Sequence, residues 1–170
     1  MTSEFVHLHN HSDYSLLDGA QKIDQLVNTI DDLNMDAVAL TEHGNMFSVL
    51  PYYKQAKKAG IKPIIGCEIY VAVGSRFEKK TRSDGGWGNN HLILLAQNFT
   101  GYKNLMKLVT AGYLEGFYYR PRIDMDLLRE YSEGLICMSA CLKGVVPEKM
   151  LKGDYEGARK EALLFSEIFQ

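Results

Sequence analysis

The hydrophobic positions of the chain alternate between two spacings, one typical of helices and one typical of buried strands. Apolar side chains recur between residues 23 and 33 at the three- and four-residue intervals of an amphipathic helix. Residues 37–41, AVALT, then form a continuous run of strand length, which is typical of a strand buried on both faces. By the same criteria we expect further helices over residues 49–59, 100–115, 124–131 and 154–169, and further strands over residues 5–9, 62–72, 91–96 and 134–139.

This order of elements predicts an α/β fold. Strands that alternate with helices through short connections are expected to pair in parallel, with right-handed crossovers. The pattern leaves open whether the sheet is an open layer or is closed into a barrel. No Gly-x-Gly-x-x-Gly or Walker A motif follows any predicted strand, so a nucleotide-binding open sheet loses its best support.

Composition narrows the class of protein without fixing its function. The chain has 170 residues, of which 46% are hydrophobic and 24% are charged, and we expect one globular domain. A net charge of −2 argues against a protein that coats nucleic acid with its whole surface. The odd number of cysteines, the lack of a secretory leader and the lack of an apolar run of about 18 residues predict a cytoplasmic protein with reduced thiols and no membrane contact.

Three of the five histidines lie at alternate positions in a short stretch, HLHNH, that begins at residue 7. Side chains two residues apart share one face of an extended strand, so His9 and His11 can aim two imidazoles at one point. Neutral imidazole nitrogens are common ligands of divalent metals. The alternatives are a solvated strand end or an artificial tag, but the histidines alternate with other residues and an apolar pair precedes them as in a strand. We therefore expect a metal site here.

Most other candidate ligands lie where predicted strands end, which is where a parallel barrel gathers its reactive groups. Two candidates do not follow this rule, because Glu68 lies inside its strand and His91 begins one. A buried glutamate is costly unless it is paired or bound to a cation, which favours a ligand role for Glu68. Taken alone, His91 is as consistent with a core histidine as with a metal ligand. The residues at or just past strand ends are His9, His11, Asp18, Glu42, His43 and Cys141.

Histidines and carboxylates from several strands suit zinc, manganese or iron better than magnesium, which prefers oxygen ligands. More than four ligands at one rim indicate two or three metals, and the spacing excludes a zinc finger. Clustered divalent metals activate water near neutral pH and clamp the oxygens of a phosphoryl group. We therefore expect hydrolysis of a phosphoester, ahead of an amide, with water as the nucleophile.

The three cysteines require separate interpretations. Cys141 follows a predicted strand end, where a soft metal ligand is favoured over a nucleophile, and a small buried apolar residue remains an alternative. Cys67 and Cys137 lie inside predicted strands and are expected in the core.

A polar, glycine-rich loop over residues 75–90 carries four basic side chains around Phe77. Such a loop could follow a phosphate backbone while an aromatic ring stacks on a base, and a solvated loop is the simpler alternative. The same two interpretations apply to residues 118–122, YYRPR. The basic residues of the loop are Arg76, Lys79, Lys80 and Arg82.

These motifs resemble those of the PHP (polymerase and histidinol phosphatase) family, and most closely those of its polymerase branch. The matching strings are FVHLHNHSDYSLLDG from residue 5, ALTEHGN from residue 39, GIKPIIGCE from residue 60 and LEGFYYRPRID from residue 114. They are distributed along essentially the whole chain. The longer strings are specific to the branch found with bacterial replicative DNA polymerases, whereas stand-alone histidinol phosphatases share only the short metal motifs.

The resemblance implies a distorted, TIM-like (β/α) barrel of about seven strands that holds up to three divalent metals. The family's final motif, Asp-x-His, has no counterpart before Gln170, so residues 1–170 are expected to be the N-terminal portion of one PHP domain. Glu42 stands where the family usually has aspartate and is expected to support the ligands, and His7 is left outside the ligand set. By position, the implied metal ligands are His9, His11, Asp18, His43, Glu68, His91 and Cys141.

Three functions are consistent with this resemblance. The first is metal-dependent 3′–5′ exonuclease proofreading at the 3′ end of a DNA primer strand, in which His9, His11, His43 and Glu68 act through bound metals and water. The second is a structural module that supports the rest of a polymerase chain and docks a separate proofreading subunit. The third, a phosphatase acting on histidinol phosphate, is disfavoured because the longer strings match the polymerase branch.

Overall fold

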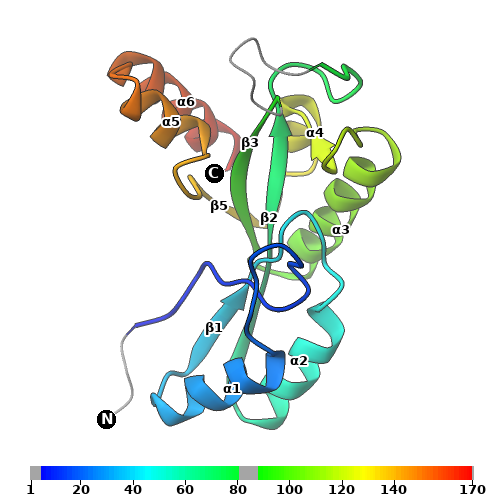
Figure 1. Ribbon diagram of the computed structural model, residues 1–170, viewed down its shortest axis with the longest axis vertical. Coiled ribbons are helices and arrows are strands. Elements are labelled where there is room, and N and C mark those ends of the chain that lie inside the picture. Colours follow the sequence, from blue (N-terminus) through cyan, green and yellow to red (C-terminus); the bar gives the residue numbers. More distant parts are fainter. Residues whose placement is uncertain (1–4, 81–87, 170) are drawn as a thin grey trace.

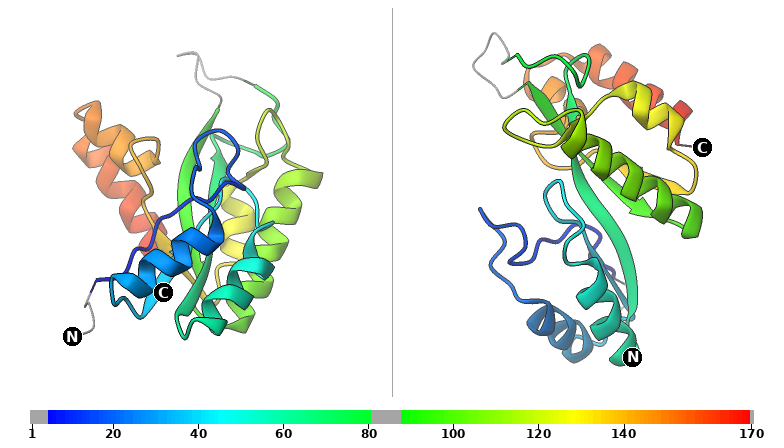
Figure 2. Two further views of the ribbon diagram at one scale, coloured as in Figure 1. Left: turned by 60° about the horizontal axis from the view of Figure 1, so that its bottom comes forward. Right: turned by 90° about the vertical axis from the view of Figure 1, so that its right-hand side faces the viewer.

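The computed structural model describes residues 5–80 and 88–169 and has the predicted α/β architecture, built around one long strand, β2 (Figure 1). This strand runs through both halves of the molecule, and helices pack beside each half (Figures 1 and 2). The helices are α1 (Ile23–Asp32), α2 (Val49–Lys58), α3 (Phe99–Leu114), α4 (Met125–Glu130), α5 (Val145–Leu151) and α6 (Tyr155–Ile168). The strands are β1 (Ala37–Leu40), β2 (Lys62–Ala72), β3 (Asn89–Ala96), β4 (Arg122–Ile123) and β5 (Leu135–Met138).

The sheet is mixed, with strand order β1-β2-β3-β5 and with β4 paired to β2 outside this path. β1 and β4 lie parallel to β2, whereas the pairs β2–β3 and β3–β5 are antiparallel. The prediction of parallel pairing throughout is therefore wrong for these two pairs. A parallel neighbour needs a crossover of about a dozen residues, usually a helix. The described part of the connection from β2 to β3 contains no helix, so β3 turns back beside β2.

The predicted strand over residues 5–9 is present only as an extended segment beside β1. Its one strand-like pairing is a bridge between His7 and Val38. The backbone N–H groups of Ala39 and Thr41 donate to the carbonyl oxygens of His7 and Asn10, at 2.8 and 2.9 Å. These bonds hold the segment against β1, so the alternate side chains that follow His7 lean toward β2.

One edge of β2 is shared by β1 at its start and β4 at its end, and the residues that follow β1 fill the gap between them. The N–H of Glu68 donates to the carbonyl oxygen of Glu42 at 3.0 Å, and the N–H of Gly44 donates to that of Glu68 at 2.8 Å. Gly44 has φ +62, and a Cβ there would meet the side chains of Pro121 and Tyr70 within 3 Å, so glycine is required. This turn fixes His43 opposite Glu68.

The two faces of the sheet have different roles. Cys67, Ile69 and Val71 of β2 point into the main core, which packs against α3 and α4. Cys67 is fully buried, as predicted, and the half-buried Cys137 packs against the same core. Glu68, between these core residues in sequence, faces the opposite side because side chains alternate along a strand. A polar site can therefore occupy that face without disturbing the core.

The other predicted helices and strands agree with the structure to within one or two residues at each end. Two elements were not predicted, the two-residue strand β4 and the seven-residue helix α5, which has no buried residue. None of the helices in the described part of the chain is long and apolar enough to span a membrane.

Arg122 anchors the backbone beside β2. It is buried, and its guanidinium donates to the carbonyl oxygens of Gly116, Arg76 and Glu78 at 2.9–3.2 Å. We expect Arg122→Lys to lower the free energy of unfolding by about 2 kcal/mol, because an ammonium group cannot reproduce this planar fork of donors. Urea unfolding measures the change.

The control for this prediction is Arg129→Lys. Arg129 is exposed and makes one ion pair with Asp126 at 3.3 Å, so its replacement should change stability by less than about 0.5 kcal/mol. Equal unfolding free energies for the two variants would show that the buried guanidinium does not anchor the backbone.

Candidate metal centre

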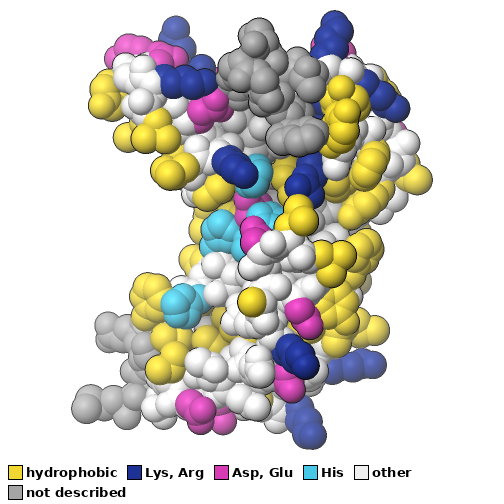
Figure 3. Space-filling view, viewed as in Figure 1, with side chains coloured by type: hydrophobic (Ala, Val, Ile, Leu, Met, Phe, Trp, Pro, Cys, Tyr) yellow, Lys and Arg dark blue, Asp and Glu magenta, His cyan; other side chains and the backbone are white. Residues whose placement is uncertain are grey.

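The seven predicted ligands come from six segments of the chain and line one pocket of about 580 Å³. In the space-filling view, histidine and acidic side chains gather at the narrow middle of the molecule (Figure 3). The segments that bring them together are the N-terminal segment, the loop behind it, the turn after β1, strands β2 and β3, and the turn after β5. The pocket residues among the predictions are His9, His11, Asp18, His43, Glu68, His91 and Cys141.

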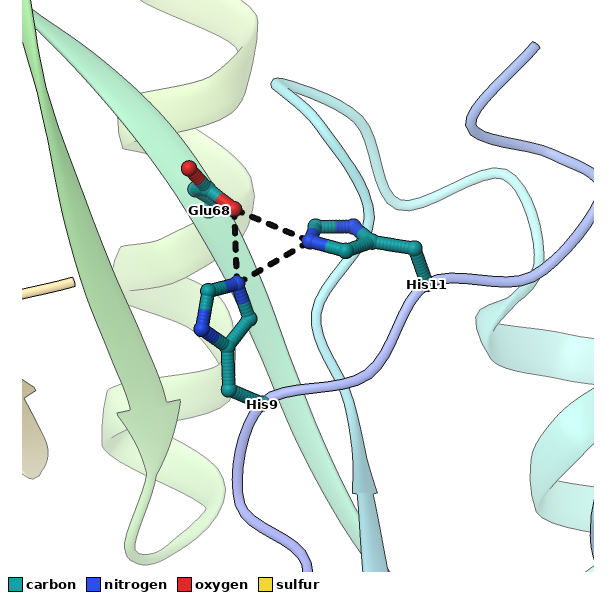
Figure 4. A group of neighbouring side chains, drawn as sticks. All are labelled: His9, His11 and Glu68. Atoms are coloured by element: carbon teal, nitrogen blue, oxygen red, sulfur yellow. Dashed lines mark hydrogen bonds and ion pairs between the residues drawn. The ribbon is translucent and has the colours of Figure 1, made fainter. Parts of the chain in front are cut away.

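His9 and His11 reach from the N-terminal segment to the carboxylate of Glu68 in β2 (Figure 4). Their Nε2 atoms lie 2.8 and 3.0 Å from the same Glu68 oxygen, Oε2, and 3.0 Å from each other. Three electronegative atoms this close are stable only when a proton or a cation lies among them. The three residues form the first group that could hold a metal ion.

His43, Glu68 and His91 form a second such group, which shares the Glu68 carboxylate with the first. His91 Nδ1 contacts Glu68 Oε1, and His43 Nδ1 lies 3.5 Å from Glu68 Oε2. His43 Nδ1 is buried and has no hydrogen-bond partner. A buried ring nitrogen without a partner is costly, and one aimed at a carboxylate is in a position to bind a cation. The residues present therefore fit a divalent metal.

The antiparallel pairing of β3 explains why His91 joins this group although it lies near the start of its strand. In the register of the two strands Tyr70 faces His91, and Glu68 faces Ile93. Glu68 and His91 are thus diagonal neighbours on one face of the sheet, close enough for their side chains to meet.

The charge of Glu68 is stabilised by the imidazoles around it. Burial would raise the pKa of Glu68, but hydrogen bonds from His11, His9 and His91 outweigh burial and lower the pKa. Burial lowers the pKa of His43, against the opposing effects of Asp18 and Glu68. A carboxylate that remains ionised and a neutral imidazole are the protonation states that bind divalent metals.

Asp18 and Cys141 lie at the margin of the pocket. Asp18 accepts a hydrogen bond from His43 Nε2 at 2.9 Å, so it contacts the ring nitrogen that points away from Glu68. Cys141 Sγ lies 3.7 Å from His91 Nδ1 and 4.0 Å from Glu68 Oε1. Neither residue belongs to the two compact groups, and both remain predicted ligands.

Glu42 does not face the pocket, and it organises the backbone behind it. Its buried carboxylate accepts hydrogen bonds from the hydroxyls of Ser12, Ser15 and Ser48 and from the N–H of Ser12. The oxygen of Ser15 accepts from the N–H of His43 at 3.0 Å and lies 3.3 Å from His11 Nδ1. Because the only proton of Ser15 goes to Glu42, His11 Nδ1 must be the donor to Ser15, and Nε2 is the ring nitrogen that faces Glu68.

The sequence interpretation missed these serines. No spacing rule distinguishes a buried hydroxyl from an exposed one. The expectation that Glu42 supports the ligands remains a prediction, with its hydrogen bonds as physical support.

The structure describes three of the four basic residues of the predicted nucleic-acid-binding loop. Arg76 donates to Asp124 and Glu115, at 2.9 and 2.6 Å, so its charge is balanced inside the fold. Lys79 and Lys80 are exposed, and Lys80 lies 3.8 Å from Glu78. Arg82 lies outside the described residues. The prediction that this loop binds nucleic acid is untested, and Arg76 gives it no support.

Comparison with known proteins identifies the family. Residues 7–170 match the family model described as PHP domain, and the chain belongs to that family. The resemblance inferred from the sequence motifs is therefore confirmed.

The relatives carry the name DNA polymerase III subunit alpha. The chain is 57% identical over 167 residues to that of Borreliella burgdorferi and 50% identical over 165 residues to that of Treponema pallidum. These alignments cover 98% and 97% of the chain and 14% of each relative, so the chain spans about 14% of their length. Among solved structures, an amidohydrolase from Chromobacterium violaceum aligns with 62% of the chain and 32% of its own, at 20% identity and a TM-score of 0.45.

Proposed function

We propose that the pocket around Glu68 binds two or three divalent metals and hydrolyses phosphodiester bonds at the 3′ end of a DNA strand. The observation that carries this proposal is one buried carboxylate whose two oxygens are approached by four imidazoles. A carboxylate in this position can bridge two cations. Asp18 and Cys141 are proposed as further ligands, and the nitrogen, oxygen and sulfur ligands suit zinc, manganese or iron.

Divalent cations held here would activate water and neutralise the charge of a phosphoryl group. The chain's own residues prepare the pocket for them. Glu68 supplies negative charge at the centre, Ser15 keeps the proton of His11 on Nδ1, and Asp18 keeps that of His43 on Nε2. In the proposed reaction a water oxygen forms a bond to phosphorus, the bond from phosphorus to the 3′ oxygen breaks, and the released 3′ oxygen gains a proton.

We further propose that residues 1–170 are the N-terminal portion of a PHP domain within a cytoplasmic replicative DNA polymerase. The names of the relatives and the small fraction of their length that the chain covers support this placement. Its partners would then be the 3′ end of the primer strand and the rest of the polymerase chain. The activity would serve 3′–5′ exonuclease proofreading. The alternative is a structural module that docks a separate proofreading subunit.

Shortening of a 5′-labelled DNA oligonucleotide tests the proposed activity. With added manganese or zinc, we expect the protein to remove nucleotides one at a time from the 3′ end. His9→Ala and His43→Ala should each lower this rate about 100-fold or more, because each variant removes a metal ligand. Their melting temperatures should change little, because both side chains lie at the pocket and outside the apolar core.

The matched control is His7→Ala. His7 lies two residues before His9, its ring packs edge-on against Phe5 at 4.8 Å, and it does not line the metal pocket. Its variant should keep the activity. If the wild type cleaves nothing while His9→Ala and His43→Ala lower the melting temperature of the metal-loaded protein, the structural alternative replaces the exonuclease.

A further inference from the structure

A second cavity, of about 1200 Å³, adjoins the metal pocket. Asp18, His43, His91 and Lys143 line both cavities, so a molecule in the larger one reaches the metal ligands directly. Tyr70 lines the larger cavity beside these shared residues. Its ring stacks on that of His43 at 6.3 Å and meets that of His91 edge-on at 5.0 Å. The larger cavity is thus continuous with the place where hydrolysis is proposed.

Two cations line this larger cavity. The guanidinium of Arg120 lies over the Tyr70 ring at 5.7 Å, and Lys143 lies at the border with the metal pocket. Within the described residues neither side chain has an ion pair. The neighbouring arginines differ, because Arg76 pairs with two carboxylates and Arg122 donates to backbone carbonyls. Arg120 and Lys143 are therefore available to an anionic ligand, and Lys and Arg side chains accumulate beside the histidines in Figure 3.

Three carboxylates also line the cavity, and two of them already have partners. Asp18 is bonded to His43, and Glu148 accepts hydrogen bonds from Lys152 and Asn90. Asp13 is the one remaining carboxylate among the described residues that line the cavity.

Aromatic and apolar side chains make up much of the rest of the wall, beside uncharged polar ones. Phe47 and Tyr113 pack against each other with ring centroids 6.2 Å apart, and they are 66% and 39% exposed. Tyr14 and Leu16, from the loop behind the histidines, add further exposed apolar surface. Exposed rings beside unpaired cations and a hydrolytic centre match a ligand that has flat bases joined by phosphates.

We propose that this cavity binds the terminal nucleotides of a single DNA strand. Arg120 and Lys143 contact the phosphates that flank the reacting one, and a base stacks on the ring pair Phe47–Tyr113. This inference rests on the proposed function for its substrate, and it assigns the recognition of the strand to the cavity in place of the basic loop at residues 75–90.

Fluorescence anisotropy with a labelled five-nucleotide oligothymidylate tests the cavity without added metal. We expect Arg120→Gln, Lys143→Gln and Phe47→Ala each to weaken binding about 5-fold or more. Arg120→Gln and Lys143→Gln should each also reduce the slope of the log binding constant against log salt concentration by about 0.7. This is the contribution of one phosphate contact to the binding of a single strand. Lys57→Gln, which removes an exposed charge on α2, should bind as the wild type does.

The inference is overturned if the wild type does not bind the oligonucleotide. It is also overturned if Lys79→Gln and Lys80→Gln weaken binding while the cavity variants do not, because the loop would then hold the strand. Failure of the proposed function has a different signature. In that case the wild type binds the oligonucleotide through the cavity but does not shorten it when manganese or zinc is added.

Discussion

Glu68→Gln is expected to abolish binding at both metal positions in one step. The glutamate is 1% exposed, and its two oxygens face His9, His11, His43 and His91, so no other residue can take its place. A neutral amide cannot bridge two cations, and its N–H₂ group would oppose them. Replacing a residue that only hydrogen-bonds to a metal ligand already lowers metal affinity about 10–100-fold. Replacing Glu68 itself should therefore lower the metal affinity at least about 100-fold. Isothermal titration with manganese or zinc measures it.

The control for Glu68→Gln is Glu156→Gln, which removes an exposed carboxylate from the first turn of α6. It should leave the number of bound metals and their affinities unchanged. If Glu68→Gln loses only one of two bound metal ions, the carboxylate binds a single metal. The proposal that it is shared between two metals is then wrong.

Glu42→Ala is expected to cause the largest loss of stability. The substitution leaves the hydroxyls of Ser12, Ser15 and Ser48 without their acceptor in a buried site. Leaving several buried donors unpaired should lower the free energy of unfolding by about 3–5 kcal/mol. In a chain of this size the melting temperature should fall by about 10 °C. Metal affinity should fall about 10–100-fold as well, because Ser15 no longer orients His11.

Glu42→Asp is the matched variant, because it keeps the carboxylate that accepts these hydrogen bonds and shortens the side chain by one methylene. It should retain most of the stability and of the metal affinity. Thermal unfolding by circular dichroism, followed by metal titration, compares the two variants. A melting temperature for Glu42→Ala within about 2 °C of the wild type would mean that this network does not hold the loop.

The parts of the site that could be predicted are those encoded by local spacing. His9 and His11 share a side of the chain because they are two residues apart, and their nitrogens meet as expected. Glu68 stands out because a carboxylate in an apolar strand needs a partner. The helix over residues 23–33 could also be predicted, because its apolar residues repeat with the helical period and all but Leu33 are buried.

The parts that could not be predicted depend on contacts distant in sequence. His91 was ambiguous because its position became clear only with the antiparallel register that places it diagonal to Glu68. Arg76 belongs to a polar loop in the sequence, and its partners Asp124 and Glu115 lie about forty or more positions away. Arg120 and Arg122 look alike in the string YYRPR, yet one lines a cavity and the other is buried. Burial of this kind comes from tertiary packing, which local periodicity does not encode.

Anomalous X-ray diffraction from crystals of the manganese- or zinc-loaded protein tests the central claim most directly. We expect anomalous peaks about 2.0–2.3 Å from ligand atoms of both groups that share the Glu68 carboxylate, one near His9 and His11 and the other near His43 and His91. Peaks confined to the protein surface, or full loading by metal with no peak beside Glu68, would contradict the account.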